Sequence, residues 1–125
     1  GLVTEVTIRK SDVFFDPQLG GTPPCTALEY MAQSIAAYVG LCARQRGEEP
    51  QLGFVLGSRA LTLDLPYFAE GERYIVHIRP EFSDQQFAAF ETQIYDASER
   101  CVASAMLNVF RPNAEEAKEM LSIQA

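Results

Sequence analysis

Apolar residues recur at every second position near the start of the chain. Between residues 2 and 9, one face carries Leu2, Val6 and Ile8, while the charged residues Glu5 and Arg9 fall on the other. Strict alternation of this kind is typical of a half-buried strand. Glycine and proline are frequent from residue 16 to 24, and that composition predicts a loop.

Four long segments after Pro50 continue the strand pattern. Short polar breaks separate them, and breaks of this length usually join antiparallel neighbours. The predicted strands are 52–65, 72–82, 86–96 and 101–111.

One segment, 26–46, has the composition of a helix instead. It contains no proline, is rich in Ala, Leu and Met, and ends before Gly47 and Pro50, which terminate helices. Thr26 and Glu29 have the spacing of a capping box at its start. Apolar residues occur nearly all round this helix, so we expect protein to surround it.

One apolar helix and five or six strands allow few architectures. An antiparallel sheet must bury one face, and this helix is the only large apolar partner that the sequence offers. We therefore predict an α+β protein of the hotdog type, in which a curved antiparallel sheet wraps a long central helix. Residues 1–125 form a single domain, ending in a tail, 112–125, with the capping pattern of a short helix at Asn113 and Glu116. The free edge of the sheet favours pairing with a second chain.

Charge and composition exclude several classes of function. Ten basic and seventeen acidic residues give a net charge of −7, and no basic run exceeds Arg9 and Lys10, so nucleic acid is not an expected partner. The cysteines, Cys25, Cys42 and Cys101, are widely spaced and favour a reducing compartment. With one histidine they are too few for a zinc site. No apolar run is long enough to span a membrane, and we expect a cytoplasmic protein.

The start of the helix resembles a known family. Residues 28–33 read Leu-Glu-Tyr-Met-Ala-Gln, similar to the Glu-Ala-Met-Ala-Gln that opens the central helix of hotdog 3-hydroxyacyl-[acyl carrier protein] dehydratases. The likeness continues through residues 53–60 and 66–72 and covers roughly residues 13–111. It is closest to the dehydratase-like proteins of aryl-polyene pigment clusters, which share Glu-Tyr-Met-Ala-Gln.

The chain departs from the family at two functional positions. Where the general family has a catalytic histidine, this chain has Phe15, and Pro24 replaces a glycine whose N–H group faces the thioester. In the pigment-cluster group a histidine precedes the first strand, and Gly1 stands at or inside that strand. The resemblance therefore implies that a preceding segment or a partner chain supplies the histidine.

Glu29 is the main candidate for catalysis. The resemblance implies that it is the acid of the reaction, whereas the sequence alone also allows a capping role with Thr26. Gln33 lies one turn further on the same face and either orients this carboxyl group or bonds to the backbone. We expect the substrate site to be lined by Phe15, Pro23, Cys25 and Gln33.

The basic residues and the histidine carry weaker expectations. An acidic carrier protein or a coenzyme A phosphate needs a local basic patch, for which Arg44, Arg46 and Arg59 are candidates. His77, the only histidine, shares a strand face with Arg73 and Arg79, so we expect it on the solvated side.

We therefore expect a dehydratase-like protein of fatty-acid or polyene-type biosynthesis. Its substrate is a 3-hydroxyacyl thioester of acyl carrier protein or coenzyme A, and it needs no cofactor or metal. Two alternatives stay open: a hotdog acyl-thioester hydrolase in which Glu29 activates water, and a non-catalytic subunit that binds acyl chains. The expected assembly is a homodimer, or a heterodimer with a related hotdog subunit.

Overall fold

The computed structural model describes residues 1–49, 53–113, 115–116 and 119, with the side chains of Phe54 and Leu56 left aside. The elements are β1 (Leu2–Thr7), β2 (Gly21–Thr22), η1 (Pro24–Thr26, a 3₁₀ turn), α1 (Ala27–Gln45), β3 (Phe54–Leu63), β4 (Phe68–Ala69), β5 (Arg73–Ser83), β6 (Phe87–Tyr95) and β7 (Cys101–Phe110).

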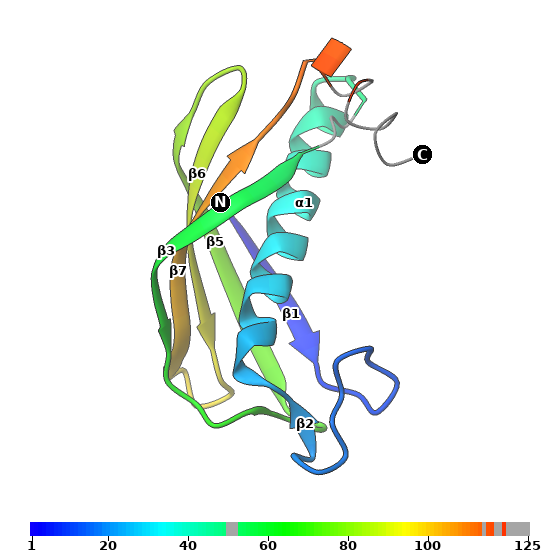
Figure 1. The fold of residues 1–125 in the computed structure, drawn as a ribbon, viewed down its shortest axis with the longest axis vertical. Coiled ribbons are helices and arrows are strands. Elements are labelled where there is room, and N and C mark those ends of the chain that lie inside the picture. The colour runs from blue at the N-terminus through cyan, green and yellow to red at the C-terminus, as the bar shows by residue number, and fades with distance from the viewer. Residues whose placement is uncertain (50–52, 114, 117–118, 120–125) are drawn as a thin grey trace.

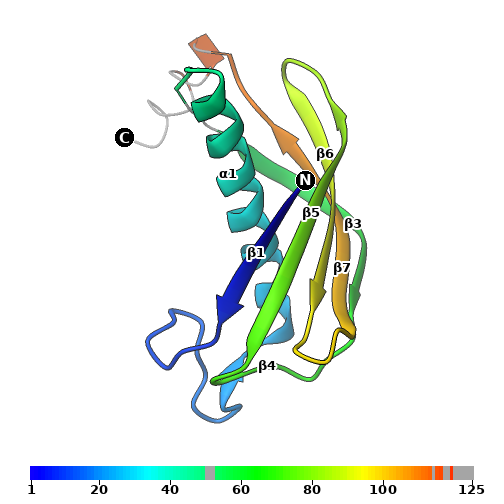
Figure 2. The same cartoon turned by 180° about the vertical axis from the view of Figure 1, so that it is seen from behind.

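Five of the strands form one antiparallel sheet in the order β1-β5-β6-β7-β3. The sheet is curved, and α1 lies lengthwise along its concave side (Figure 1; Figure 2). The predicted strands and the α+β class are confirmed, although most strands are slightly shorter than the sequence pattern indicated and β5 is shifted by one residue. Residue 52, the expected start of one strand, lies outside the described residues.

The helix begins differently from the prediction. Thr26 already has helical backbone angles, with φ −65° and ψ −11°, because the 3₁₀ turn η1 precedes α1. A capping residue needs an extended backbone, and Thr26 makes no side-chain capping bond. Its hydroxyl donates instead to the carbonyl oxygen of Pro23, at 2.5 Å. The expected capping box between Thr26 and Glu29 is therefore wrong.

Only one face of α1 is buried in the single chain. Met31 and Ile35 lie in the core, and Ser34 bonds to Thr4 of β1 with 2.6 Å between their hydroxyl oxygens. The opposite face leaves Ala37 exposed and Leu41 45 % exposed. The all-round apolar character of the helix predicted that protein surrounds it, but its own chain covers only one face. A second chain could cover the free face.

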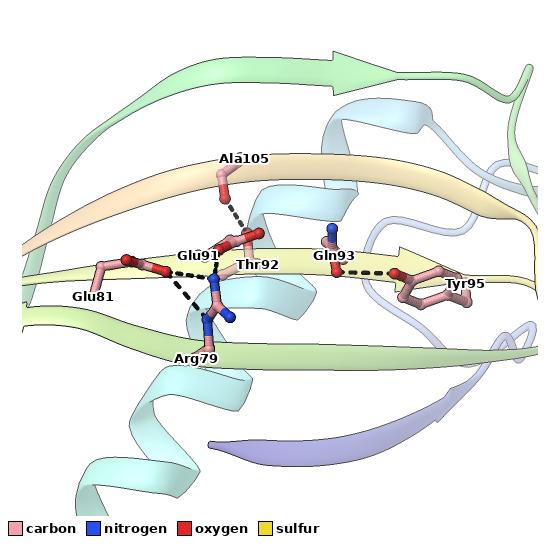
Figure 3. Close-up of polar contacts among 7 residues, drawn as sticks. All are labelled: Arg79, Glu81, Glu91, Thr92, Gln93, Tyr95 and Ala105. Carbon is pink, nitrogen blue, oxygen red and sulfur yellow. Dashed lines mark hydrogen bonds and ion pairs between the residues drawn. The ribbon is translucent and has the colours of Figure 1, made fainter.

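The convex face of the sheet carries charged side chains from β5 and β6. Arg79 on β5 forms ion pairs with Glu81 and Glu91 (Figure 3). His77 packs edge-on against Tyr95, with 5.0 Å between ring centres. Hydrogen bonds with Glu91 and then Arg79 hold the pKa of Glu81 below its usual value. The prediction that His77 lies on the solvated side is confirmed, and the core lies between the concave face and α1.

Little of the predicted tail is described. Glu115, Glu116 and Glu119 have helical backbone, and the Glu116 N–H donates to the side-chain oxygen of Asn113 at 2.7 Å. This is the capping contact that the spacing predicts. The remainder of the expected segment 112–125, apart from Pro112, lies outside the described residues.

Candidate functional site

The loop before α1 is fastened to the turn between β4 and β5. β2 pairs with β4, and the N–H of Glu70 donates to the carbonyl oxygen of Gly20 at 2.9 Å. A Cβ atom at Gly21 would lie 1.9 Å from the carbonyl oxygen of Phe68. Glycine at this position therefore allows the loop to approach β4 closely enough to lead straight into the start of the helix.

A chain of buried hydroxyl groups holds this loop on the first turn of α1. The hydroxyl oxygens of Thr22 and Tyr30 are 2.9 Å apart, and those of Thr22 and Thr26 are 3.1 Å apart. The Tyr30 ring packs edge-on against Phe68, which packs edge-on against Tyr74. Burial raises the pKa of the Tyr74 hydroxyl, which accepts a hydrogen bond from the Ala69 N–H.

Glu29 lies in the first turn of α1 with an exposed side chain. Gln33 donates from Nε2 to Glu29 Oε1 at 3.1 Å, so Gln33 orients this carboxylate and does not bond to the backbone through that amide. Within the described part of the chain, no lysine or arginine forms an ion pair with Glu29. The other carboxylate oxygen, Oε2, makes no hydrogen bond within the described residues.

The other expected substrate residues lie on the segment that leads to Glu29. Pro23 immediately precedes the 3₁₀ turn that leads into α1, and the exposed Cys25 lies within this turn. Phe15 lies earlier in the loop, is half-buried and packs against the core. Pro23 and Cys25 therefore lie directly before the helix, and the contact of all three residues with a substrate stays a prediction.

The three candidate arginines do not share one element. Arg44 and Arg46 lie at the C-terminal end of α1, where Arg46 pairs with Glu48 at 3.3 Å. Arg59 is exposed on the edge strand β3. Their role in binding a carrier protein is therefore a proposal that rests on charge alone.

An apolar cavity of about 510 Å³ lies beside the second half of α1. Its walls come from α1 and from four strands, and include Ile35, Val39, Phe90 and Val109. Tyr38, also on its wall, bonds to the Cys42 thiol, and this bond and burial raise the pKa of Tyr38. Sequence reasoning did not find this cavity, because strands distant in the sequence form it.

A comparison with models of known protein families assigns the chain to a family. The ApeP-like family model, described as ApeP dehydratase, matches residues 1–122. The chain belongs to the ApeP-like dehydratase family. The resemblance to hotdog dehydratases of the aryl-polyene type is thereby confirmed. No curated protein matches the chain in sequence.

Solved structures support the same fold for this ApeP-like chain. The dehydratase heterocomplex ApeI:P from Xenorhabdus doucetiae matches with a TM-score of 0.84 and 29% identity, over 95% of this chain and 80% of that chain. PA2801, a putative thioesterase from Pseudomonas aeruginosa, matches with a TM-score of 0.70 and 11% identity, over 91% of this chain and 85% of that one. HI0827, a hexameric broad-specificity acyl-coenzyme A thioesterase, matches with a TM-score of 0.68 and 12% identity, over 92% of this chain and 82% of that one. The hotdog fold is therefore shown.

Neither a membrane-spanning helix nor a metal cluster occurs in the described part of this ApeP-like chain. No helix there is both long and apolar enough to cross a membrane. No group of three or more metal-binding side chains comes together in the same residues.

Proposed function

We propose that the chain is a dehydratase-type hotdog subunit acting on 3-hydroxyacyl thioesters, with Glu29 as the acid. One observation carries this proposal: among the described residues, only Gln33 bonds to the Glu29 carboxylate, at the end of α1 where the exposed helix face would meet a second subunit. Because the capping box does not form, a helix-capping role no longer accounts for this glutamate. Family membership supports dehydration as the reaction type.

The reaction needs one base and one acid on the substrate. The base takes the proton from the carbon next to the thioester carbonyl, and protonated Glu29 gives its proton to the hydroxyl group, which leaves as water. A carbon–carbon double bond forms, and the base carries the abstracted proton away. A second subunit over this helix end would exclude water from Glu29.

His77, the only histidine in the sequence, does not serve as the base in this proposal. His77 lies on the convex face of the sheet, against Tyr95, whereas α1 lies on the concave face. The position that aligns with the catalytic histidine of the wider family is Phe15. We propose that the histidine comes from a second hotdog chain or from a segment preceding Gly1. The substrate would be carried by acyl carrier protein or coenzyme A.

The test is the Glu29→Gln variant, assayed together with a related hotdog partner on a 3-hydroxyacyl carrier-protein substrate. Glutamine keeps the shape and can still bond to Gln33, but it donates no acidic proton. We expect dehydration to fall by about 100-fold or more, the usual contribution of a general acid. Glu72→Gln is the matched control, since Glu72 is exposed and makes no side-chain hydrogen bond within the described residues. Equal rates for Glu29→Gln and the control would overturn the proposal.

A thioester hydrolase is the second candidate, and one observation favours it. Glu29 is exposed, and no histidine of the described chain lies on the concave side of the sheet with it. An ionised carboxylate in this position could activate a water molecule. Release of free thiol from a saturated acyl thioester, with no 3-hydroxyl group present, separates hydrolysis from dehydration. Thiol release that depends on Glu29 would favour the hydrolase.

A non-catalytic role is the third candidate. A subunit that only binds acyl chains and completes an active partner would leave the rate unchanged when Glu29 is replaced. It would, however, make the activity of the partner depend on the presence of this chain. Comparing the partner alone with the mixture tests this role.

A further inference from the structure

The apolar cavity beside the second half of α1 ends at an arginine. Its volume of about 510 Å³ lies within the range of small-molecule sites, and most of its wall is apolar. Arg111, which follows β7, lies on this wall and also lines a neighbouring open cleft that contains Asp84 and Gln86. The cavity therefore has an apolar interior and a charged side where it meets the cleft.

The Arg111 guanidinium is only partly satisfied. Its Nη2 donates to Ser83 Oγ at 3.0 Å and to the carbonyl oxygen of Asp84 at 2.7 Å. Its Nε is buried and has no hydrogen-bond partner in the described structure. The nearby Asp84 carboxylate accepts hydrogen bonds from the Phe87 and Gln86 N–H groups, and these bonds, with a smaller effect of the Arg111 charge, lower its pKa. No described carboxylate lies within ion-pair distance of Arg111.

A buried donor without an acceptor is uncommon, because leaving it unpaired costs free energy. An arginine presents its N–H groups in a planar fork that matches both oxygens of a carboxylate. Arg46, on the same cavity wall, adds a second positive charge on a protein whose net charge is −7. Because Arg46 pairs with the exposed Glu48, it contributes less than Arg111 to the binding of an anion.

We propose that this cavity binds an amphiphilic carboxylate, such as a medium-chain fatty acid. The hydrocarbon chain lies against Val39, Phe90 and Val109, and the carboxylate bonds to the Arg111 guanidinium. The charged end of the site is distant from Glu29, because Glu29 and Arg46 are seventeen positions apart on or beside α1, which corresponds to roughly 25 Å of helix. The apolar wall extends back along α1 to Ala32, about one turn from Glu29. The assignment of the carboxylate to Arg111 therefore does not depend on the catalytic role of Glu29.

Calorimetric titration of the full chain with three compounds tests the proposal. Octanoate has both the chain and the charge, octanol has the chain alone, and acetate has the charge alone. We expect octanoate to bind at least about tenfold more tightly than either of the others, the effect of a charge-assisted hydrogen bond together with a buried chain. Equal binding of octanol and octanoate would overturn the carboxylate assignment, and so would no binding of octanoate.

Two variants locate the site. Arg111→Met removes the guanidinium and should weaken octanoate at least about tenfold, whereas Arg79→Met, on the convex face, should not. Because Arg111 also holds Ser83 and Asp84, a second variant leaves it intact. A Cβ atom at Gly40 would meet no atom within 4 Å, and Gly40 lines the cavity, so Gly40→Leu adds an apolar side chain to the cavity wall from a position where its first carbon is unobstructed. Unchanged octanoate affinity in Gly40→Leu, or in a folded Arg111→Met, would contradict the proposal.

Discussion

Thr22 and Tyr30 join the loop and the helix of the candidate site through hydroxyl oxygens 2.9 Å apart. Thr22 is fully buried and Tyr30 is nearly so, so water cannot easily replace either partner. The contact fixes the loop that carries Pro23 and Cys25 on the same turn of α1 that presents Glu29. The loop and the carboxylate are therefore positioned by one buried polar contact.

Removing the Tyr30 hydroxyl should loosen this arrangement. Tyr30→Phe keeps the ring contact with Phe68 but leaves Thr22 with the hydroxyl of Thr26 as its remaining side-chain partner. We expect the free energy of unfolding to fall by about 1–2 kcal/mol, measured by urea denaturation. Tyr95→Phe, which loses a partly buried hydrogen bond to Gln93, is the control and should cost less. A loss no greater than that of the control would show that the buried hydroxyls contribute little.

The sequence predicted those parts of the fold that depend on local pattern. Alternation identified the strands, and the Glu29–Gln33 pair follows from the spacing of one helical turn. The start of the helix was mispredicted because Pro23 and Pro24 were not recognised as the entry to a 3₁₀ turn. Proline fixes φ near −65° at Pro24, so the chain is already helical when it reaches Thr26.

The polar contacts between distant segments could not be predicted in the same way. The Thr22–Tyr30 bond depends on the loop returning to β4, and the contacts of Arg111 with Ser83 and Asp84 join residues 28 and 27 positions apart. Such pairs become visible only when the strand register is known. The cavity was missed for the same reason.

The close approach of Gly21 to Phe68 makes a second prediction. In Gly21→Ala the new Cβ atom would lie 1.9 Å from a backbone oxygen, so β2 or β4 must move. We expect a loss of about 1–3 kcal/mol or more in the free energy of unfolding, as for other overpacked sites. Gly57→Ala is the matched control, since a Cβ atom there meets nothing within 4 Å. Thermal and urea unfolding of both variants check the difference, and similar stabilities would contradict the close packing of β2 on β4.

Asp84 should make stability depend on acid pH. It closes the β5–β6 turn by accepting hydrogen bonds from the N–H groups of Phe87 and Gln86, which hold its pKa below its ordinary value. A carboxyl group with a lowered pKa in the folded state stabilises the fold above its unfolded pKa. This stabilisation is lost as the pH falls through the folded value, that is, below about pH 4.

The variant Asp84→Asn isolates this effect. Asparagine keeps an acceptor oxygen for the turn but does not titrate, so the stability difference between wild type and variant should shrink as the pH falls from about 5 toward 2. Urea unfolding across this range measures the difference, and an NMR titration of the Asp84 carboxyl carbon measures its pKa directly. A difference that is independent of pH would show that Asp84 titrates alike in the folded and unfolded chain.

The exposed face of α1 leads to the last prediction, which concerns assembly. Ala37 and Leu41 are exposed there, and β3 is a free edge strand that carries the exposed Val55. A second hotdog chain would remove this apolar surface from water. We therefore expect light scattering to give a mass of about twice 13.9 kDa for the chain alone, or a mixed complex with a related hotdog subunit.

Ala37→Arg retains a good helix former but places a charge in the contact, which should release the single chain. Ala97→Arg, in the exposed turn before β7, adds the same charge elsewhere and should leave the assembly intact. A wild-type chain that stays at 13.9 kDa both alone and in the mixture would contradict the expectation, and so would an Ala37→Arg variant that assembles as the control does.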